Sequence, residues 1–422
     1  MNVTVSGKTL SGTVTAIASK SAVHRLLICA AFSNAPTVIE NVTTSQDIEA
    51  TIRCLQHVAD ITLKNNRLFV TPRQKREQSP LLNCGESGST LRFLLPVIAA
   101  TGGGSFVGHG RLAERPLSPL YELLAENGCR LSKAGEFPLT VSGTLQGDTF
   151  AIDGGVSSQF ISGLLLAAPL LNRQVRIVVT GKTESAPYIR LTVEALRCFG
   201  VTVEEKENTF LVQGRYTSPG TVTAEGDWSN AAFWLVGAAI SHSKKLTVTG
   251  LKSDSLQGDR HILTLLQQAG FTVNQTENGI TVDGVAKKPL CIDAADIPDM
   301  VPIAAVLAAS LHGKTKIINA RRLAYKESNR LQSVHQMLTA LGGTATVTAD
   351  SLTIDGKGGL RGGTVDACND HRIAMSAAIA SLICEKDVTI LGANAADKSY
   401  PDFFQKLEQK GMSVCPLSGE TI

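Results

Sequence analysis

Basic and hydroxyl side chains recur where this sequence begins a helix, and they indicate chemistry on a small anion. Lys20 and Ser21 open one apolar segment, with Arg25 one helical turn later, and Arg372 opens another. The first N–H groups of a helix have no partner within it, and the helix dipole adds partial positive charge there. A cation in that place is unfavourable for the helix itself but favourable for a bound anion. The pattern therefore predicts sites for phosphate or carboxylate groups.

Further clusters of the same composition occur along the chain. Gly88 lies in a glycine- and serine-rich segment, where a missing side chain would let a ligand approach the backbone. Arg115 lies in a loop and suits bidentate contacts to carboxylate or phosphate, and Asp299 is a carboxylate at another predicted helix start. Taken singly, each could equally be a helix cap or a solvated surface charge. The remaining candidates are Ser157, Ser158, Gln159, Ser185, Lys326, Glu327, Arg330 and Lys398.

The clusters recur with a period of about 70 residues, and an apolar helix follows each of them. The predicted helices are 22–32, 91–100, 161–170, 231–240, 303–311 and 373–383. A second marker, a glycine just past another helix, repeats with the same period. These glycines are Gly128, Gly200, Gly270, Gly342 and Gly411. Two markers with one period predict six repeats, each reading strand, helix, strand, helix and two strands.

Six repeats predict an α/β protein of two domains with three repeats each. We expect one domain to comprise residues 1–18 and 226–422, and the other to comprise residues 19–225. Because the first 18 residues precede the first cluster, we expect one strand in them to belong to the later domain. In the second repeat, the first strand is predicted at residues 67–70.

The composition is that of an ordinary soluble protein and excludes several classes of function. The 422 residues carry a net charge of +3 without a basic run, so no nucleic-acid partner is expected. No apolar stretch approaches the ~18 residues of a membrane span. The nine cysteines form no CxxC pair, so we expect no metal, no disulfide framework and a cytoplasmic location. Without a P-loop or a GxGxxG motif, the anions are not expected to be ATP or NAD.

The ordered set of motifs closely resembles the EPSP synthase (3-phosphoshikimate 1-carboxyvinyltransferase) family of enolpyruvyl transferases, essentially end to end. The motifs are Ser19-Lys20-Ser21 with Arg25, Cys84–Arg92, Glu114-Arg115-Pro116, Ser157-Ser158-Gln159, Pro298-Asp299, Lys326–Arg330, Asn369–Arg372 and Lys398–Asp402. The resemblance implies two inside-out α/β domains. It also implies transfer of the enolpyruvyl group of phosphoenolpyruvate to the 5-hydroxyl of shikimate 3-phosphate, in the shikimate pathway to chorismate and aromatic amino acids. Phosphate leaves through a tetrahedral intermediate, without a cofactor or metal, and a monomer is expected.

The family pattern also implies roles for individual residues. Asp299 would accept the proton of the 5-hydroxyl, and Glu327 or Lys20 would protonate the methylene carbon. The residues implied to hold shikimate 3-phosphate are Lys20, Ser21, Arg25, Ser157, Ser158, Gln159, Ser185, Asp299 and Lys326. Those implied to hold phosphoenolpyruvate are Lys20, Gly88, Arg115, Gln159, Arg330, Arg372 and Lys398. Residues 19–225 would form the shikimate 3-phosphate side, and the other domain the donor side with the acid and base. The inhibitor glyphosate is expected to compete with phosphoenolpyruvate, with Gly88 leaving room for it.

The sequence departs from the family pattern at three positions and leaves two other functions to be weighed. Glu86 stands where many relatives have Asn, Arg322 where some have a substrate-contacting Asn, and Asn329 where Asp is common. The sister enzyme that acts on UDP-N-acetylglucosamine typically carries a reactive Cys in the loop equivalent to Gly108–Ser118, and no Cys lies there. A non-catalytic anion-binding protein of the same fold is the other alternative, but the residues of the acid/base set are present.

Overall fold

The computed structural model describes residues 1–75, 77–242, 245–285 and 288–417. Contacts between residues divide the chain into two compact units. One unit comprises Met1–Ile17 together with Gly226–Ile422, and the other comprises Ala18–Glu225.

In the part of the chain that the structure describes, the strands form six four-stranded sheets of one construction. Each sheet has one parallel pair of strands, and two further strands continue it in antiparallel pairing; in four of the six sheets a helix connects the two parallel strands. In one example, β10 pairs with β11 in parallel, with Ala151 opposite Val178. The strand β13 then pairs with β11, and β12 pairs with β13, both antiparallel. The predicted order of strands and helices within a repeat is therefore found.

The unit Ala18–Glu225 contains three of these sheets and the helices packed on them. Its helices are α1 (Lys20–Ala31), α2 (Gln46–Leu55), α3 (Gly88–Ala100), α4 (Leu120–Glu126), α5 (Ser158–Ala167) and α6 (Ala186–Cys198). Its strands are β3 (Thr37–Glu40), β4 (Ala59–Lys64), β5 (Arg67–Pro72), β6 (Leu81–Asn83), β7 (Gly103–Val107), β8 (Cys129–Leu131), β9 (Leu139–Gly143), β10 (Thr149–Asp153), β11 (Val175–Thr180), β12 (Thr202–Lys206), β13 (Thr209–Gln213) and β14 (Thr221–Thr223).

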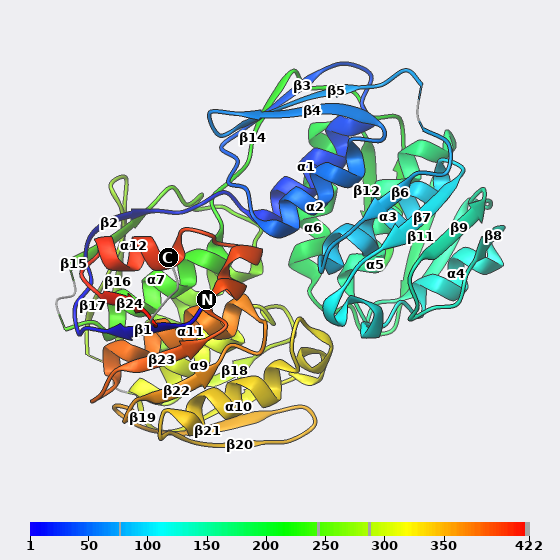
Figure 1. Cartoon of the computed structure of the whole chain (residues 1–422). Coiled ribbons are helices and arrows are strands. Elements are labelled where there is room, and N and C mark those ends of the chain that lie inside the picture. The colour runs from blue at the N-terminus through cyan, green and yellow to red at the C-terminus, as the bar shows by residue number, and fades with distance from the viewer. Residues whose placement is uncertain (76, 243–244, 286–287, 418–422) are drawn as a thin grey trace. The chain divides into compact units, whose positions relative to one another are not determined.

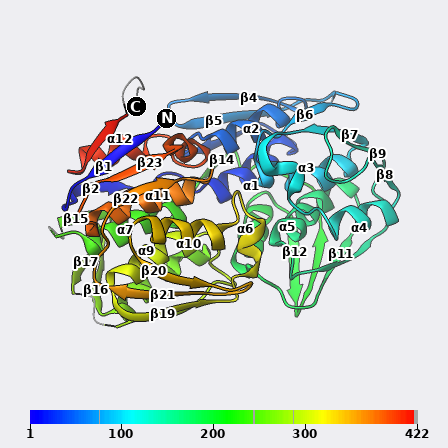
Figure 2. The same cartoon turned by 60° about the horizontal axis from the view of Figure 1, so that its bottom comes forward.

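The other unit repeats the construction with three more sheets, and Figure 2 shows α9 and α10 on one side of its strands β19, β20 and β21. Its helices are α7 (Trp228–Ile240), α8 (Ile262–Ala269), α9 (Val301–Ser310), α10 (Arg330–Ala340), α11 (His371–Ala380) and α12 (Phe403–Gln409). Its strands are β1 (Val3–Ser6), β2 (Ser11–Thr15), β15 (Lys245–Thr249), β16 (Phe271–Thr276), β17 (Gly279–Gly284), β18 (Cys291–Asp293), β19 (His312–Ile318), β20 (Thr344–Val347), β21 (Leu352–Lys357), β22 (Gly363–Asp366), β23 (Val388–Leu391) and β24 (Ser413–Pro416).

Two strands complete a sheet of a repeat that is distant in the sequence. The strand β2 precedes α1 but pairs in parallel with β15, and β14 precedes α7 but pairs in parallel with β3. The strand β1 lies between β23 and β24. The sequence predicted that one N-terminal strand belongs to the later unit, but two strands do, β1 and β2. The predicted strand at residues 67–70 exists as β5, but it pairs with β3 and β4 in the first repeat, and β6 precedes α3.

The helices that open the repeats form the interior of each unit, which confirms the inside-out arrangement. In the later unit, α7, α9 and α11 contact one another (Figure 1), and every residue of α7 and α11 is buried. A helix that is apolar all round belongs in a core. The sheets cover these helices from outside, and each unit has a hydrophobic core of its own.

Each of these helices begins two or three residues earlier than predicted, and in five of the six a capping side chain lies upstream of the predicted start. Ser19, Ser87, Ser157, Asp227 and Asp370 each accept a backbone N–H of the first turn. Lys20 and Arg372 consequently lie inside the first turn and not before it. The five marker glycines adopt positive φ between 74° and 107°, the conformation that suits glycine after a helix.

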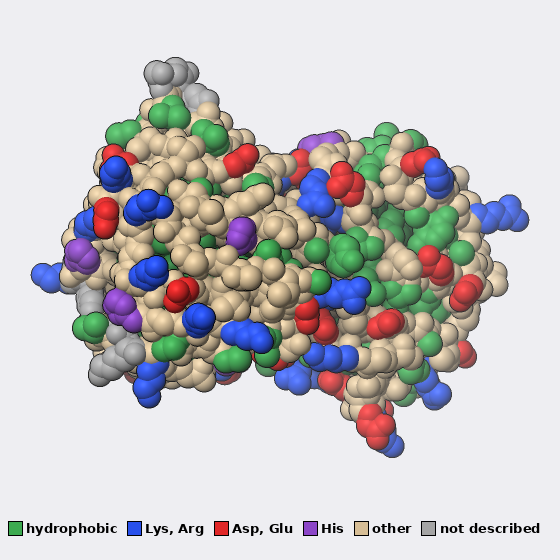
Figure 3. Space-filling model, turned by 90° about the horizontal axis from the view of Figure 1, so that it is seen from below, with side chains coloured by type: hydrophobic (Ala, Val, Ile, Leu, Met, Phe, Trp, Pro, Cys, Tyr) green, Lys and Arg blue, Asp and Glu red, His purple; other side chains and the backbone are tan. Residues whose placement is uncertain are grey.

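The surface fits the small net charge of the chain. On the face seen in Figure 3, basic and acidic side chains are interspersed. Among the described residues, no helix is both long and apolar enough to cross a membrane.

Candidate active site

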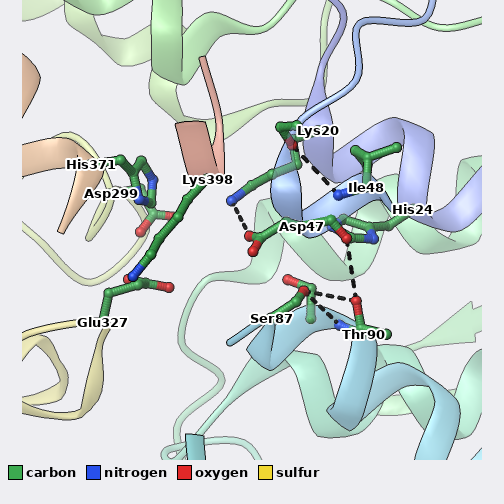
Figure 4. A network of polar contacts seen from close by, with 12 residues as sticks. Lys20, His24, Asp47, Ile48, Ser87, Thr90, Asp299, Glu327, His371 and Lys398 are labelled. Carbon is green, nitrogen blue, oxygen red and sulfur yellow. Dashed lines mark hydrogen bonds and ion pairs between the residues drawn. The ribbon is translucent and has the colours of Figure 1, made fainter. Parts of the chain in front are cut away.

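Lys20 is the first residue of α1, and a carboxylate from the next helix fixes its side chain. Its ammonium group donates to Asp47 Oδ2 at 2.6 Å (Figure 4). Asp47 lies in the first turn of α2, where the positive end of that helix also favours its negative charge. Both side chains are largely buried. The pair therefore holds a cation at the start of α1, where an anion would bind.

Arg25 lies one turn further along α1 and is fully engaged with neutral partners. Its Nε donates to Thr192 Oγ1 at 2.7 Å, while Nη1 and Nη2 donate to the backbone carbonyls of Ser21 and Tyr188. The guanidinium also lies over the ring of Phe93. Burial lowers the pKa of Arg25 to about 10. Arg25 thus connects α1 with α6 and adds positive charge beneath the first turn of α1.

Gln159 connects the starts of α5 and α3. Its amide nitrogen donates to Ser89 Oγ at 2.9 Å, and its oxygen accepts from Arg92 Nη1 at 3.0 Å. Ser157 caps α5 by accepting the backbone N–H of Gln159, and Ser158 is buried beside it. These donors from two repeats therefore lie together. Arg92, which also donates to the carbonyl of Pro116, belongs to this group although it was not among the predicted site residues.

Gly88 opens α3, and the guanidinium of Arg115 lies directly against it. A Cβ built at Gly88 would come within 2.5 Å of Arg115 Nη1 and 2.7 Å of Arg115 Cζ. Only glycine allows this approach, so the cation lies on the first turn of α3. The space that the sequence suggested for an inhibitor is thus filled by Arg115 in this structure. Glu86, the first departure from the family pattern, lies against Gly110 in the turn that leads to Arg115.

Ser185 immediately precedes α6 and has a left-handed backbone, with φ of 54°. Its side chain is buried and makes no capping bond to the helix. Ser185 lies at the start of α6, the helix whose Tyr188 and Thr192 accept hydrogen bonds from Arg25.

In the unit Met1–Ile17 with Gly226–Ile422, Arg330 binds three carboxylates at once. Its Nε donates to Asp370 Oδ2 at 2.8 Å, and its Nη1 and Nη2 each lie 2.6 Å from a carboxylate oxygen, of Asp299 and Glu327 respectively. Burial alone would lower the pKa of Arg330, but the three carboxylates raise it well above the ordinary value. Arg330 is therefore a permanent charge that positions both predicted acid/base residues.

Asp299 lies just before α9 and is held in its ionised form. Its Oδ1 accepts from Lys326 Nζ at 3.1 Å as well as from Arg330. Burial favours its neutral form, but Lys326, Arg330 and Arg372 outweigh burial and hold the pKa of Asp299 well below the ordinary value. The pKa of Lys326 is lowered, chiefly by burial. A helix cap, one of the alternatives that the sequence left open for Asp299, is not what the structure shows, because Met300 occupies the N-cap position of α9.

Arg372 lies in the first turn of α11 and is only 4% exposed. Its Nε and Nη1 have no hydrogen-bond partner among the residues that the structure describes. Its guanidinium lies 5.8 Å from the centre of the Phe233 ring. A buried donor without a partner is costly for the fold. A cation in this state, at a helix start, is what an anion site requires.

Two further charged residues complete this group. Lys398 is almost fully buried, and its ammonium donates to the carbonyl of Asn369 at 2.7 Å, next to the cap of α11. Asp259 accepts from the Ser229 hydroxyl, and its pKa is raised to about 6, by burial first and by the charge of Asp299 second. Asp259 and Asp299 therefore have opposite pKa shifts although their charges interact.

The structure brings the predicted residues together as two groups, one in each unit. The unit Ala18–Glu225 contains Lys20, Ser21, Arg25, Gly88, Arg115, Ser157, Ser158, Gln159 and Ser185, and the other unit contains Asp299, Lys326, Glu327, Arg330, Arg372 and Lys398; most of them lie at or near helix starts. Sequence reasoning missed Asp47 and the binding of Asp370 to Arg330. Among the described residues, no cluster of three or more His, Cys, Asp or Glu side chains could hold a metal ion.

Comparison with known proteins decides the family. The model of the EPSP synthase (3-phosphoshikimate 1-carboxyvinyltransferase) family matches residues 5–407. The chain belongs to the EPSP synthase family. A 3-phosphoshikimate 1-carboxyvinyltransferase of Clostridium kluyveri is 40% identical over 98% of this chain and 98% of its own. A second one, from Clostridium novyi, is 37% identical over 97% of both chains.

Solved structures agree with the EPSP synthase fold. An EPSP synthase of Acinetobacter baumannii has a TM-score of 0.80 and 25% identity, with 98% of this chain and 99% of that chain covered. The enolpyruvyl transferase NikO of Streptomyces tendae has a TM-score of 0.79 at 19% identity, covers 98% of both chains and shows the fold alone. The six-repeat, two-domain fold predicted from the sequence is thus confirmed.

Proposed function

We propose that this chain transfers the enolpyruvyl group of phosphoenolpyruvate to the 5-hydroxyl of shikimate 3-phosphate. The products are 5-enolpyruvylshikimate 3-phosphate and inorganic phosphate. The observation that carries the proposal is a buried cation in the first turn of α11 together with an ionised carboxylate just before α9. Nε and Nη1 of Arg372 have no hydrogen-bond partner among the described residues and can bind an anion, and the charge of Arg372 helps to keep Asp299 ionised and able to accept a proton. Membership of the EPSP synthase family supports the choice of substrates.

The unit Ala18–Glu225 is proposed as the shikimate 3-phosphate side. The phosphate is a dianion and needs several donors, which the starts of α1 and α5 provide. Arg25 contributes mainly through its charge, because neutral partners already occupy its nitrogens. Asp299 and Lys326 of the other unit are proposed to contact the acceptor at its 5-hydroxyl. The full proposed set is Lys20, Ser21, Arg25, Ser157, Ser158, Gln159, Ser185, Asp299 and Lys326.

The donor is proposed to bind through cations that recur at helix starts. Phosphoenolpyruvate carries a carboxylate and a phosphate, and planar guanidinium groups are suited to both. Arg372 has donors available within the described structure, whereas Arg330 must share those that now hold carboxylates. The full proposed set is Lys20, Gly88, Arg115, Gln159, Arg330, Arg372 and Lys398.

Proton transfer accompanies both bond-forming and bond-breaking steps. The 5-hydroxyl oxygen attacks C2 of the donor while Asp299 takes the hydroxyl proton, and Glu327 or Lys20 delivers a proton to C3. The C2–O bond to phosphate then breaks, and loss of a proton from C3 restores the double bond. Cations around the phosphate stabilise it as it leaves. A bound anion also weakens the hold of Lys326 and Arg330 on Asp299, which raises its affinity for a proton.

A phosphate-release assay with phosphoenolpyruvate tests the function. We expect release that depends on shikimate 3-phosphate and none above background with UDP-N-acetylglucosamine as the acceptor. Equal release with both acceptors, or release only with the sugar nucleotide, would overturn the proposal. A monomer in the cytoplasm is proposed as well, in keeping with nine cysteines that are all free thiols. Analytical ultracentrifugation checks the oligomeric state.

A further inference from the structure

Asp47 forms an ion pair with Lys20, and the family pattern gave it no role. The distance between Lys20 Nζ and Asp47 Oδ2 is 2.6 Å, and the side chains are 16% and 12% exposed (Figure 4). The two residues begin different helices, α1 and α2. Most surface ion pairs contribute little because solvent competes with them. This pair is largely shielded from solvent, so it restrains the Lys20 side chain more strongly than a surface ion pair would.

Hydrogen bonds on the far side of Asp47 fix its backbone. The hydroxyls of Thr51 and Thr90 lie 3.4 and 3.5 Å from the carbonyl oxygen of Asp47, and 2.7 Å from each other. Thr90 also donates to Ser87, the cap of α3, at 2.8 Å. Both threonines are fully buried. The position of Asp47 is therefore tied to the start of α3, where Gly88 and Arg115 lie.

His24 contributes to this network without adding charge. His24 lies on α1, one turn after Lys20. Its Nδ1 lies 2.8 Å from Thr51 Oγ1. Burial, together with the charges of Lys20 and Arg25, holds the pKa of His24 well below its ordinary value. The ring is thus neutral. Asp47 remains the charged partner that the network presents to Lys20.

A lysine used as an anion ligand benefits from such a partner for two reasons. Its four-carbon chain has many rotamers, and immobilising it costs conformational entropy. A carboxylate that takes one of the three N–H groups directs the other two and restrains the chain before the substrate arrives. The carboxylate also offsets the unfavourable placement of a cation in the first turn of α1.

We propose that Asp47 is a positioning residue that orients the Lys20 ammonium for the substrate anions. The inference rests on the proposed function, in which Lys20 contacts both substrates. Asp47 itself takes no proton and touches no reacting atom in this account. It acts through Lys20 alone, and the hydrogen bonds through Thr51 and Thr90 hold it in a fixed position relative to the start of α3.

Asp47→Asn is the variant that tests this, because it keeps the size of the side chain and removes its charge. We expect kcat/KM for phosphoenolpyruvate to fall about 10- to 100-fold, the range that misplacement of a ligand group produces. Asp47→Glu should recover part of the loss. Glu49→Gln is the matched control. Glu49 is exposed in the same first turn of α2, and its substitution by Gln removes the same charge. Glu49→Gln should keep the activity of the unaltered protein.

A double-mutant cycle separates positioning from a general structural effect. In the Lys20→Ala background, Asp47→Asn should cause no further loss of kcat/KM, because the residue through which it acts is gone. Additive losses would overturn the proposal, and so would unchanged kinetics of Asp47→Asn in an active protein. An equal fall in thermal stability for Asp47→Asn and Glu49→Gln, with activity lost only in the former, would support it.

A readout without catalysis keeps the two proposals distinguishable. Acylation of Lys20 by an amine-reactive reagent, followed by peptide mass spectrometry, reports how firmly its ammonium is held. Lys20 should react several-fold faster in Asp47→Asn than in Glu49→Gln. If the unaltered protein releases no phosphate but the labelling rates differ in this way, the proposed function fails and the positioning of Lys20 stands. Equal labelling rates would contradict the positioning itself.

Discussion

Arg25 and Arg330 are both buried arginines near helix starts, one in each unit, and their surroundings are opposite in charge. Arg25 donates to hydroxyls and backbone carbonyls, and burial lowers its pKa to about 10. Arg330 donates to three carboxylates, which raise its pKa well above the ordinary value. The surroundings of Arg25 thus keep a net positive charge, whereas Arg330 is combined with carboxylates. This difference suits anion binding near Arg25 and proton transfer near Arg330.

The largest expected effect comes from removing the cation that three carboxylates share. Arg330→Ala leaves Asp299, Glu327 and Asp370 without their partner, and we expect a loss of about 3–5 kcal/mol in the free energy of unfolding near neutral pH. Arg25→Ala leaves only neutral groups and should cost about 1–3 kcal/mol. Urea denaturation at two pH values measures both. The Arg330→Ala loss should shrink at acidic pH, and a loss equal to that of Arg25→Ala at every pH would refute the comparison.

Asp299 tests the proton-transfer half of the comparison. Asp299→Ala is expected to fold and bind both substrates but to turn over about 10²-fold more slowly, the usual share of a general base. Steady-state phosphate release measures the turnover, and circular dichroism controls for folding. Turnover near that of the unaltered protein would show that another group accepts the proton.

Asp259 tests the opposite pKa shifts of the two carboxyls. Its pKa of about 6 in the folded protein exceeds an unfolded value of about 3.9. The folded state therefore binds more protons between these values, and this group makes the protein less stable as the pH rises from about 4 to about 6. Asp259→Asn should remove that slope and gain about 3 kcal/mol above pH 6. Denaturation midpoints across pH 4–7 measure it, and an unchanged slope would contradict the account.

Gly88 tests how closely the cation of Arg115 approaches a helix start. A methyl group at residue 88 would overlap the guanidinium, so Arg115 must move. We expect Gly88→Ala to lower the affinity for phosphoenolpyruvate and the affinity for glyphosate equally, by about 10-fold if one charged hydrogen bond is lost. Inhibition constants against varied phosphoenolpyruvate measure both. Loss of glyphosate affinity alone would show that the methyl excludes the inhibitor and leaves Arg115 in place.

Much of the fold could be read from local signals in the sequence. The six apolar helices were predictable because a helix without a polar face must be buried, and the marker glycines because a helix end requires positive φ. The starts of the helices were misplaced because the caps, such as Ser19 and Asp370, were assigned to the clusters before the helix. The pairing of β2 with β15 was not predictable, since its partner lies more than two hundred residues away.

The candidate site was predictable as a set of residues but not as a set of contacts. Helix position and residue type marked Lys20, Arg330 and Arg372, and the resemblance to the family completed the set. The contacts that tune these residues join distant positions. Arg330 and Asp370 are 40 residues apart, and Arg92 and Gln159 are 67 apart. No local pattern carries such pairs, so the pKa of Asp299 and the role of Asp47 required the structure.

The affinity of Arg372→Gln for phosphoenolpyruvate tests the central claim most directly. Arg372 is a buried cation whose Nε and Nη1 have no partner among the described residues, which suits it to binding the donor. The Arg372→Gln substitution should raise the KM for phosphoenolpyruvate about 10- to 100-fold, which corresponds to the free energy of one or two charged hydrogen bonds. The free energy of unfolding should not fall, because no ion pair of these atoms is lost. An unchanged KM, or destabilisation with normal donor affinity, would contradict it.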